Sequence, residues 1–122
     1  MEKKYFVDNI EFDADIVMEM FRGVFEYIGS HVLDYDDLNL ECEIYEDYDI
    51  QYMNLADWRL EILLDSGHIT NDIKLKAQEM YQLSKGMFGD DVERTAQFIR
   101  TSPEWQKIVF LADEIKNFIS KI

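Results

Sequence analysis

The chain has 122 residues, of which 48% are hydrophobic and 14% aromatic, and its 26 acidic and 12 basic residues give a net charge of −14. This length corresponds to a single domain, 1–122, and the aromatic content excludes a disordered acidic tail, which would lack the side chains of a core. The single cysteine, Cys42, excludes an internal disulfide framework and a metal site built from cysteines alone.

Targeting signals are not evident at the start of the chain. The first residues carry charges throughout, unlike a secretory signal, and no uncharged apolar run approaches the roughly 20 residues needed to cross a bilayer. We therefore expect a cytoplasmic protein that does not bind membranes. Its charge is uneven: residues 5–58 hold 15 acidic residues and one base, Arg22, whereas residues 59–122 hold 10 acidic and nine basic residues. This difference predicts one acidic face.

The first part of the chain predicts a short extended piece, a helix and a small hairpin. Residues 5–12 favour the extended piece. Asp13 is a suitable N-cap, and the apolar residues over 17–32 recur at spacings of three and four, which is typical of an amphipathic helix. Apolar and polar residues then alternate over 38–44, as in a strand with one wet face. A hairpin near residues 38–53 and an irregular acidic loop both fit this segment.

The second part predicts helices separated by clear turns. Asn54 can cap a helix that stops at Gly67, although the alternation over 58–64 also fits a strand. Thr70 or Asn71 can cap the next helix, which we expect to end near Gly86.

Two more helices are expected before the C-terminus. One opens at Asp90 or Asp91. The sequence Ser102-Pro103-Glu104 combines a serine cap, a proline in the first helical position and an early acid, and thus predicts the start of a final helix that runs to the end of the chain. The expected fold is mainly α, with about five helices in one compact domain and a possible small antiparallel β-hairpin near residues 38–53.

Residues that could carry catalysis are few. His31 and His68 stand outside any catalytic motif, and Cys42 lies between two glutamates that disfavour its thiolate. A twelve-residue calcium loop starting at Asp34 would have Asn39 where it needs glycine and a tyrosine where it needs the bidentate carboxylate. The glycines form no phosphate-binding loop. We therefore expect no catalytic residue, no metal, no cofactor and no enzymatic activity.

The strongest functional signal is an acidic segment that also contains tyrosines. Residues 34–49 hold eight acids and no base. A solvated surface would explain the acids alone, but crowding like charges destabilises a fold, and tyrosine is enriched at interface hot spots. Acids steer a basic partner while aromatic rings pack against it. The expected partner-binding residues are Tyr35, Asp36, Asp37, Glu41, Glu43, Tyr45, Glu46, Asp47, Tyr48 and Asp49.

These features favour an acidic protein inhibitor of the immunity or antitoxin kind. It would neutralise a basic partner, with a nuclease toxin as the leading candidate, by covering its substrate groove. Two alternatives use the same features differently: a phage anti-defence protein that mimics DNA, and a non-catalytic homodimeric adaptor or regulatory protein with Trp58, Trp105 and the last helix at its interface. Direct binding to nucleic acid is not expected, because that affinity comes from Lys and Arg. The sequence leaves the partner's identity and the oligomeric state open.

Overall fold

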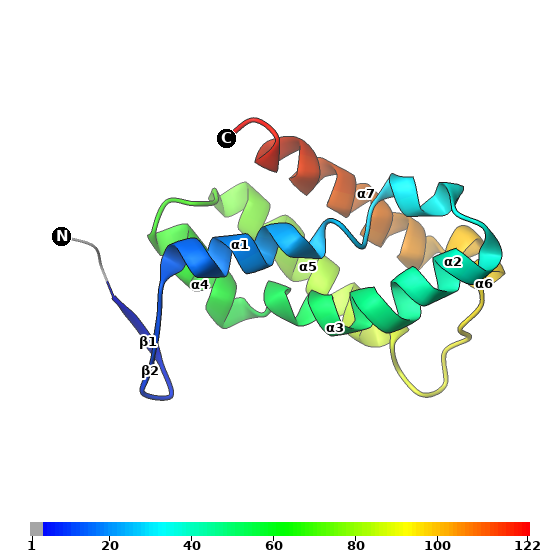
Figure 1. The fold of residues 1–122 in the computed structure, drawn as a ribbon, viewed down its shortest axis with the longest axis horizontal. Helices are drawn as coiled ribbons and strands as arrows, with labels where there is room; N and C mark the ends of the chain where they lie inside the picture. The colour runs from blue at the N-terminus through cyan, green and yellow to red at the C-terminus, as the bar shows by residue number, and fades with distance from the viewer. Residues whose placement is uncertain (1–3) are drawn as a thin grey trace.

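The computed structural model describes residues 4–122 and is mainly α-helical, as expected (Figure 1). The extended piece expected at residues 5–12 is an antiparallel hairpin of β1 (Tyr5–Val7) and β2 (Ile10–Phe12). Asp8 and Asn9 form its turn with φ values of 51° and 67°, a left-handed conformation that these two residue types tolerate better than most. The hairpin projects from one end of the helical body (Figure 1).

The helix expected over 17–32 is divided. Asp13 caps α1 (Ala14–Val24) as predicted, and its carboxylate accepts a hydrogen bond of 2.8 Å from the backbone N–H of Asp15. The chain then turns at Gly29, where φ is 143°, and continues as the 3₁₀-helix η1 (Ser30–Asp34). This backbone conformation is essentially restricted to glycine, so Gly29 sets the direction in which η1 leaves the turn that follows the end of α1 at Val24.

The segment near residues 38–53 is helical, so the hairpin predicted there is wrong in its position. It consists of α2 (Asp37–Cys42), the π-helical η2 (Glu43–Tyr48), α3 (Asp49–Gln51) and the 3₁₀-helix η3 (Tyr52–Leu55). We call residues 37–51 the acidic helix. The one small antiparallel sheet of the described residues is the hairpin at residues 5–12.

A period of four explains the error. Along the acidic helix Leu40, Ile44 and Tyr48 are fully buried, whereas Leu38 and Ile50 are 70% and 72% exposed. An α-turn takes about 3.6 residues and a π-turn takes more, so the mixed helix repeats nearly every four residues. Even-numbered apolar residues therefore fall alternately on two opposite sides of a helix, which resembles the alternation of a strand.

Two of the remaining four helices begin where their caps were expected, whereas the helix expected to start after Asn54 begins at Asp57 and has no side-chain cap. The four helices are α4 (Asp57–Asp65), α5 (Asn71–Met87), α6 (Ala96–Thr101) and α7 (Pro103–Ile119). Thr70 caps α5 and Ser102 caps α7, both as predicted. The helix expected to open at Asp90 or Asp91 begins instead at Ala96, because Thr95 provides the cap and accepts a hydrogen bond from the N–H of Phe98.

An aromatic cluster occupies the core where the acidic helix meets α5 and α7. The rings of Tyr48 and Phe88 lie 6.3 Å and 5.6 Å from the ring of Trp105, which is fully buried. The Tyr48 hydroxyl also forms a buried hydrogen bond of 2.6 Å with Oγ of Ser84 on α5. The acidic helix is thus fixed to the body through its inner side. Within the described part of the chain, no helix is long and apolar enough to cross a membrane.

The Tyr48→Phe substitution is expected to lower the free energy of unfolding by about 1–2 kcal/mol, because it leaves the buried Ser84 hydroxyl without its partner. Chemical denaturation measures this change. The Ser84→Ala variant provides the control, since Tyr48→Phe should cost less in that background. Equal costs in both backgrounds would show that the hydrogen bond does not contribute.

Candidate functional site: the acidic helix and a pocket beside the hairpin

Three of the predicted partner-binding acids stabilise the fold itself. Asp36 caps α2 by accepting a hydrogen bond of 2.8 Å from the N–H of Asn39. Asp37 forms an ion pair with a guanidinium on α6. Glu41 accepts a hydrogen bond of 2.8 Å from the first backbone N–H of α6, at Ala96. Asp37 and Glu41 hold the start of the acidic helix against α6, and Asp36 stabilises its first turn, so all three carboxylates are already engaged.

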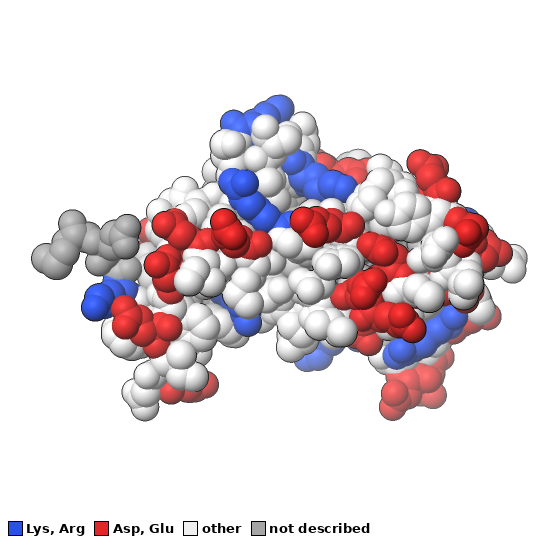
Figure 2. Space-filling model, viewed as in Figure 1, with Lys and Arg blue, Asp and Glu red and all other residues white. Residues whose placement is uncertain are grey.

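Four further acids of the predicted set make no such contacts within the fold. No hydrogen bond or ion pair joins their side chains to any residue in the range 4–122. Two of them are exposed and two are partly buried at the edges of the acidic helix. Figure 2 shows acidic side chains gathered over α1 and the acidic helix, whereas much of the basic surface in that view lies over the C-terminal part of α7. We call the four residues the unpaired acids: Glu43, Glu46, Asp47 and Asp49.

Glu43 experiences the crowding directly. Its pKa is raised, first because partial burial disfavours the carboxylate and second because Asp47 carries a like charge one turn further on, while His31 acts in the opposite direction. The folded protein therefore holds a proton at Glu43 more tightly than the unfolded chain does. The ionised carboxylate reduces stability at neutral pH, and this reduction disappears as the pH falls through the raised pKa and then the ordinary value of 4.5.

The Glu43→Gln substitution is accordingly expected to raise the free energy of unfolding at pH 7 by about 0.3–0.5 kcal/mol, the magnitude of a like-charge pair on a helix surface. The gain should shrink toward pH 4, where wild-type Glu43 is itself protonated. Urea denaturation at several pH values measures it, with Asp91→Asn in an exposed loop as the control. A loss of stability at neutral pH would contradict this interpretation of Glu43.

The tyrosines face the protein more than the solvent. Tyr48 is fully buried, so it cannot contact a partner and is removed from the expected set. Tyr45 is half-buried: its hydroxyl donates a hydrogen bond of 3.3 Å to the carbonyl of Glu93, and burial raises its pKa to about 12. Tyr35 is half-buried and lies edge-on to the ring of His31. Tyr35 and Tyr45 thus retain only a part of each side chain for a partner.

The outer side of the acidic helix carries exposed apolar side chains and not the tyrosine rings expected there. Leu38, Ile50 and Met53 are 70%, 72% and 51% exposed. Sequence reasoning placed them in a hairpin and so missed them as surface residues. The signal for Leu38 and Ile50 is a period of four, which the buried Leu40 and Ile44 also follow two positions out of step, so the two pairs fall on opposite sides of one helix.

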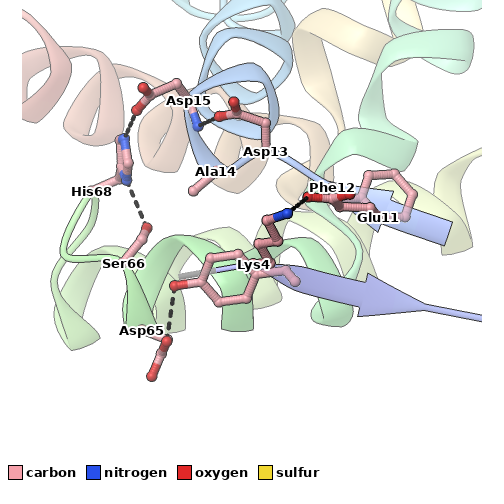
Figure 3. Close-up of a pocket in the computed structure, with 10 residues that line it drawn as sticks. Lys4, Glu11, Phe12, Asp13, Ala14, Asp15, Asp65, Ser66 and His68 are labelled. Carbon is pink, nitrogen blue, oxygen red and sulfur yellow. Dashed lines mark hydrogen bonds and ion pairs between the residues drawn. The ribbon is translucent and has the colours of Figure 1, made fainter. Parts of the chain in front are cut away.

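A pocket of about 430 Å³ lies at the other end of the molecule (Figure 3). The hairpin, the N-terminal turn of α1 and the turn after α4 line it. In it the Oγ of Ser66 lies 2.6 Å from Nδ1 of His68, and Nε2 of His68 lies 2.8 Å from a carboxylate oxygen of Asp15. No local pattern predicts this arrangement, because Asp15 is 53 positions away from His68.

The three residues have the composition of a serine hydrolase triad, but their surroundings favour a structural role. Ser66 Oγ also lies 3.2 Å from the carbonyl oxygen of Leu63 in its own helix end. The pocket is lined by further carboxylates, including Asp65, which would repel an oxyanion rather than stabilise it. We assign the His68–Asp15 contact to joining the turn after α4 to the start of α1.

The His68→Ala substitution is expected to lower the free energy of unfolding by about 1 kcal/mol, because it removes both hydrogen bonds of the imidazole. Thermal unfolding measures this effect. Hydrolysis of p-nitrophenyl acetate provides the complementary assay, and it should not depend on Ser66. Hydrolysis that is lost on both Ser66→Ala and His68→Ala would contradict the structural role and indicate an enzyme.

The described residues contain no group of three His, Cys, Asp or Glu side chains placed to hold a metal ion, and this includes the acids at residues 34–39.

No family model, no curated protein and no solved structure matches the chain.

Proposed function

We propose that the protein is an acidic inhibitor of the immunity or antitoxin kind, which binds and neutralises a basic partner, with a nuclease toxin as the leading candidate. The observation that carries this proposal is the unpaired acids, gathered on a helix whose inner side is fixed in the core. They offer fixed negative charge to a cationic surface, so they would accelerate its capture and set its orientation.

The use of the basic residues supports this proposal. Lysines on α5 pair with Glu61, Asp72 and Glu114, and Arg100 pairs with Asp37. These bases are paired with other acids, and no Lys or Arg of the described residues forms an ion pair with the unpaired acids. Like charges left together reduce stability, and a partner that supplies the missing cations is a physical reason for keeping them.

The backbone adds a second line of support. Glu43, Glu46 and Asp47 all lie on η2, a π-helical stretch of six residues. Such turns are rare and occur frequently at functional sites. Here the wide turn keeps Ile44 and Tyr48 on the buried side, so the three acids remain on the outer sides of the helix.

Most of the surface expected at a homodimer interface is buried within the protein itself. Trp105 is fully buried, and the apolar side of α7 packs inside the protein. Trp58 is half-buried, with the ring of Phe12 4.8 Å away and the guanidinium of Arg59 4.4 Å from its ring centre. A phage anti-defence mimic of DNA would use the same unpaired acids, and the nature of the partner distinguishes it from a toxin inhibitor.

Affinity capture from the native lysate at low salt tests the proposal with a matched pair of variants. The acid-neutral variant carries Glu43→Gln, Glu46→Gln, Asp47→Asn and Asp49→Asn. The control variant removes the same charge from exposed acids elsewhere, through Asp8→Asn, Glu19→Gln, Asp90→Asn and Asp91→Asn.

Wild type and the control variant are expected to retain the same basic protein, and the acid-neutral variant to lose it. The captured protein should cleave a labelled nucleic acid, and adding wild type should stop that cleavage. A basic partner without such activity would point to the anti-defence or adaptor alternative. Equal capture by both variants would contradict binding through the unpaired acids.

A further inference from the structure

The outer side of the acidic helix forms a single row. Since the mixed α and π turns repeat nearly every four residues, Leu38, Cys42, Glu46 and Ile50 lie one above another, opposite the buried row. Met53 follows Ile50 on η3 and is 51% exposed. The row runs for about 18 Å at the rise of an α-helix, which is the length of more than three turns. It ends at each extremity in an exposed aliphatic side chain.

Acids border this row on both sides. Glu43 and Asp47 follow one edge, while Glu41 and Asp49 follow the other. Exposed aliphatic side chains flanked by charges, here Leu38 and Ile50 with Glu46 between them, suit lengthwise packing of a second helix, in which the apolar side chains provide contact and the charges select the partner. Here every flanking charge is negative, so the complementary helix must carry positive flanks.

A second copy of this chain does not meet that requirement. Two acidic helices packed together would bring the flanking carboxylates of one against those of the other, and like charges across such a seam oppose pairing. An extended peptide fits less well too, because the acidic helix presents no sheet edge for it to join. The charge and the shape of the row thus specify one kind of occupant.

We propose that the acidic helix binds an amphipathic helix of the partner, in which an apolar seam is flanked by lysine or arginine. Leu38 and Ile50 contact the two ends of that seam, and Glu46 pairs with a cation between them. The unpaired acids at the edges pair with the flanking cations. This inference rests on the proposed function and specifies which element of the basic partner is recognised.

Two synthetic peptides of equal composition test it. Both contain the same leucines and lysines; in the first the leucines share one helix face, and in the second they are distributed around the helix. Fluorescence anisotropy at physiological salt measures the affinity of each. The amphipathic peptide is expected to bind about 10-fold more tightly, because burial of a single leucine is enough for that difference. Its circular dichroism should gain helical signal on binding.

Matched variants locate the contact. Leu38→Gln with Ile50→Gln should remove the preference for the amphipathic peptide. Ile16→Gln with Leu75→Gln should retain it, since those two side chains are 60% and 56% exposed on other helices. Equal affinity of the two peptides for wild type, binding without gain of helix, or equal effects of the two variant pairs would each overturn the inference.

The peptide and capture experiments can fail separately. Capture that depends on the unpaired acids, combined with no preference for the amphipathic peptide, would overturn the helical partner and leave the inhibitor proposal in place. A clear preference for the amphipathic peptide, combined with capture that ignores the unpaired acids, would support the helical contact and contradict the inhibitor proposal.

Discussion

Association with the captured basic partner is expected to slow by about 100-fold between low salt and about 0.5 M salt, because long-range attraction by the unpaired acids is screened as the Debye length shrinks. Stopped-flow fluorescence measures the association rate. The signal comes from Trp58, which lies outside the acidic helix, or from a label on the partner. The acid-neutral variant should associate slowly at all salt concentrations, and its rate should change little with salt.

The control variant separates local charge from net charge. It has the same net charge as the acid-neutral variant, so a fast and salt-dependent rate in the control assigns the attraction to the acidic helix. A wild-type rate that does not change with salt would contradict electrostatic capture by this surface.

The second large effect concerns Gly29, which directly precedes η1. Gly29→Ala is expected to lower the free energy of unfolding by about 3 kcal/mol. A side chain at φ 143° is strained, and the new Cβ would lie 3.0 Å from a carboxylate oxygen of Asp113 and from the Lys116 ammonium. The same carboxylate accepts a hydrogen bond of 2.9 Å from the N–H of Ser30, so movement of Asp113 would also weaken this contact between α7 and η1.

Gly23→Ala provides the matched control for Gly29. Gly23 lies within α1, and a Cβ there would meet nothing within 4 Å. Alanine at this position should therefore stabilise the protein by about 0.5–1 kcal/mol. Chemical denaturation of the two variants should give shifts of opposite sign. A neutral effect of Gly29→Ala would show that the η1 turn relaxes without loss of stability.

The parts of the fold that the sequence predicted are those with local chemical signals. Asp13, Thr70 and Ser102 each cap a helix as expected, because capping depends on a side chain and a backbone N–H two or three positions away. The mainly α architecture followed from these caps and from the apolar spacing. The acidic helix was missed because a π-helical stretch changes the period on which sequence interpretation depends.

Sequence reasoning identified the crowded acids of residues 34–49, and their binding of a partner stays a prediction. Crowded acids are visible in a sequence, whereas their engagement is not: Glu41 is engaged only because Ala96, 55 positions later, comes within hydrogen-bond distance. Tyr48 looked like a surface ring because tyrosine has a polar end, yet that end is bonded to the buried Ser84. Long-range contacts of this kind become visible only in the folded protein.

The most direct test measures the stability and the binding of the acid-neutral variant side by side with wild type and the control variant. Removing the unpaired acids should leave the midpoint of thermal unfolding unchanged or higher, since like-charge repulsion is relieved, and should weaken binding to the basic partner by at least about 10-fold. Lower stability combined with unchanged binding would show that these carboxylates serve the fold and not a partner.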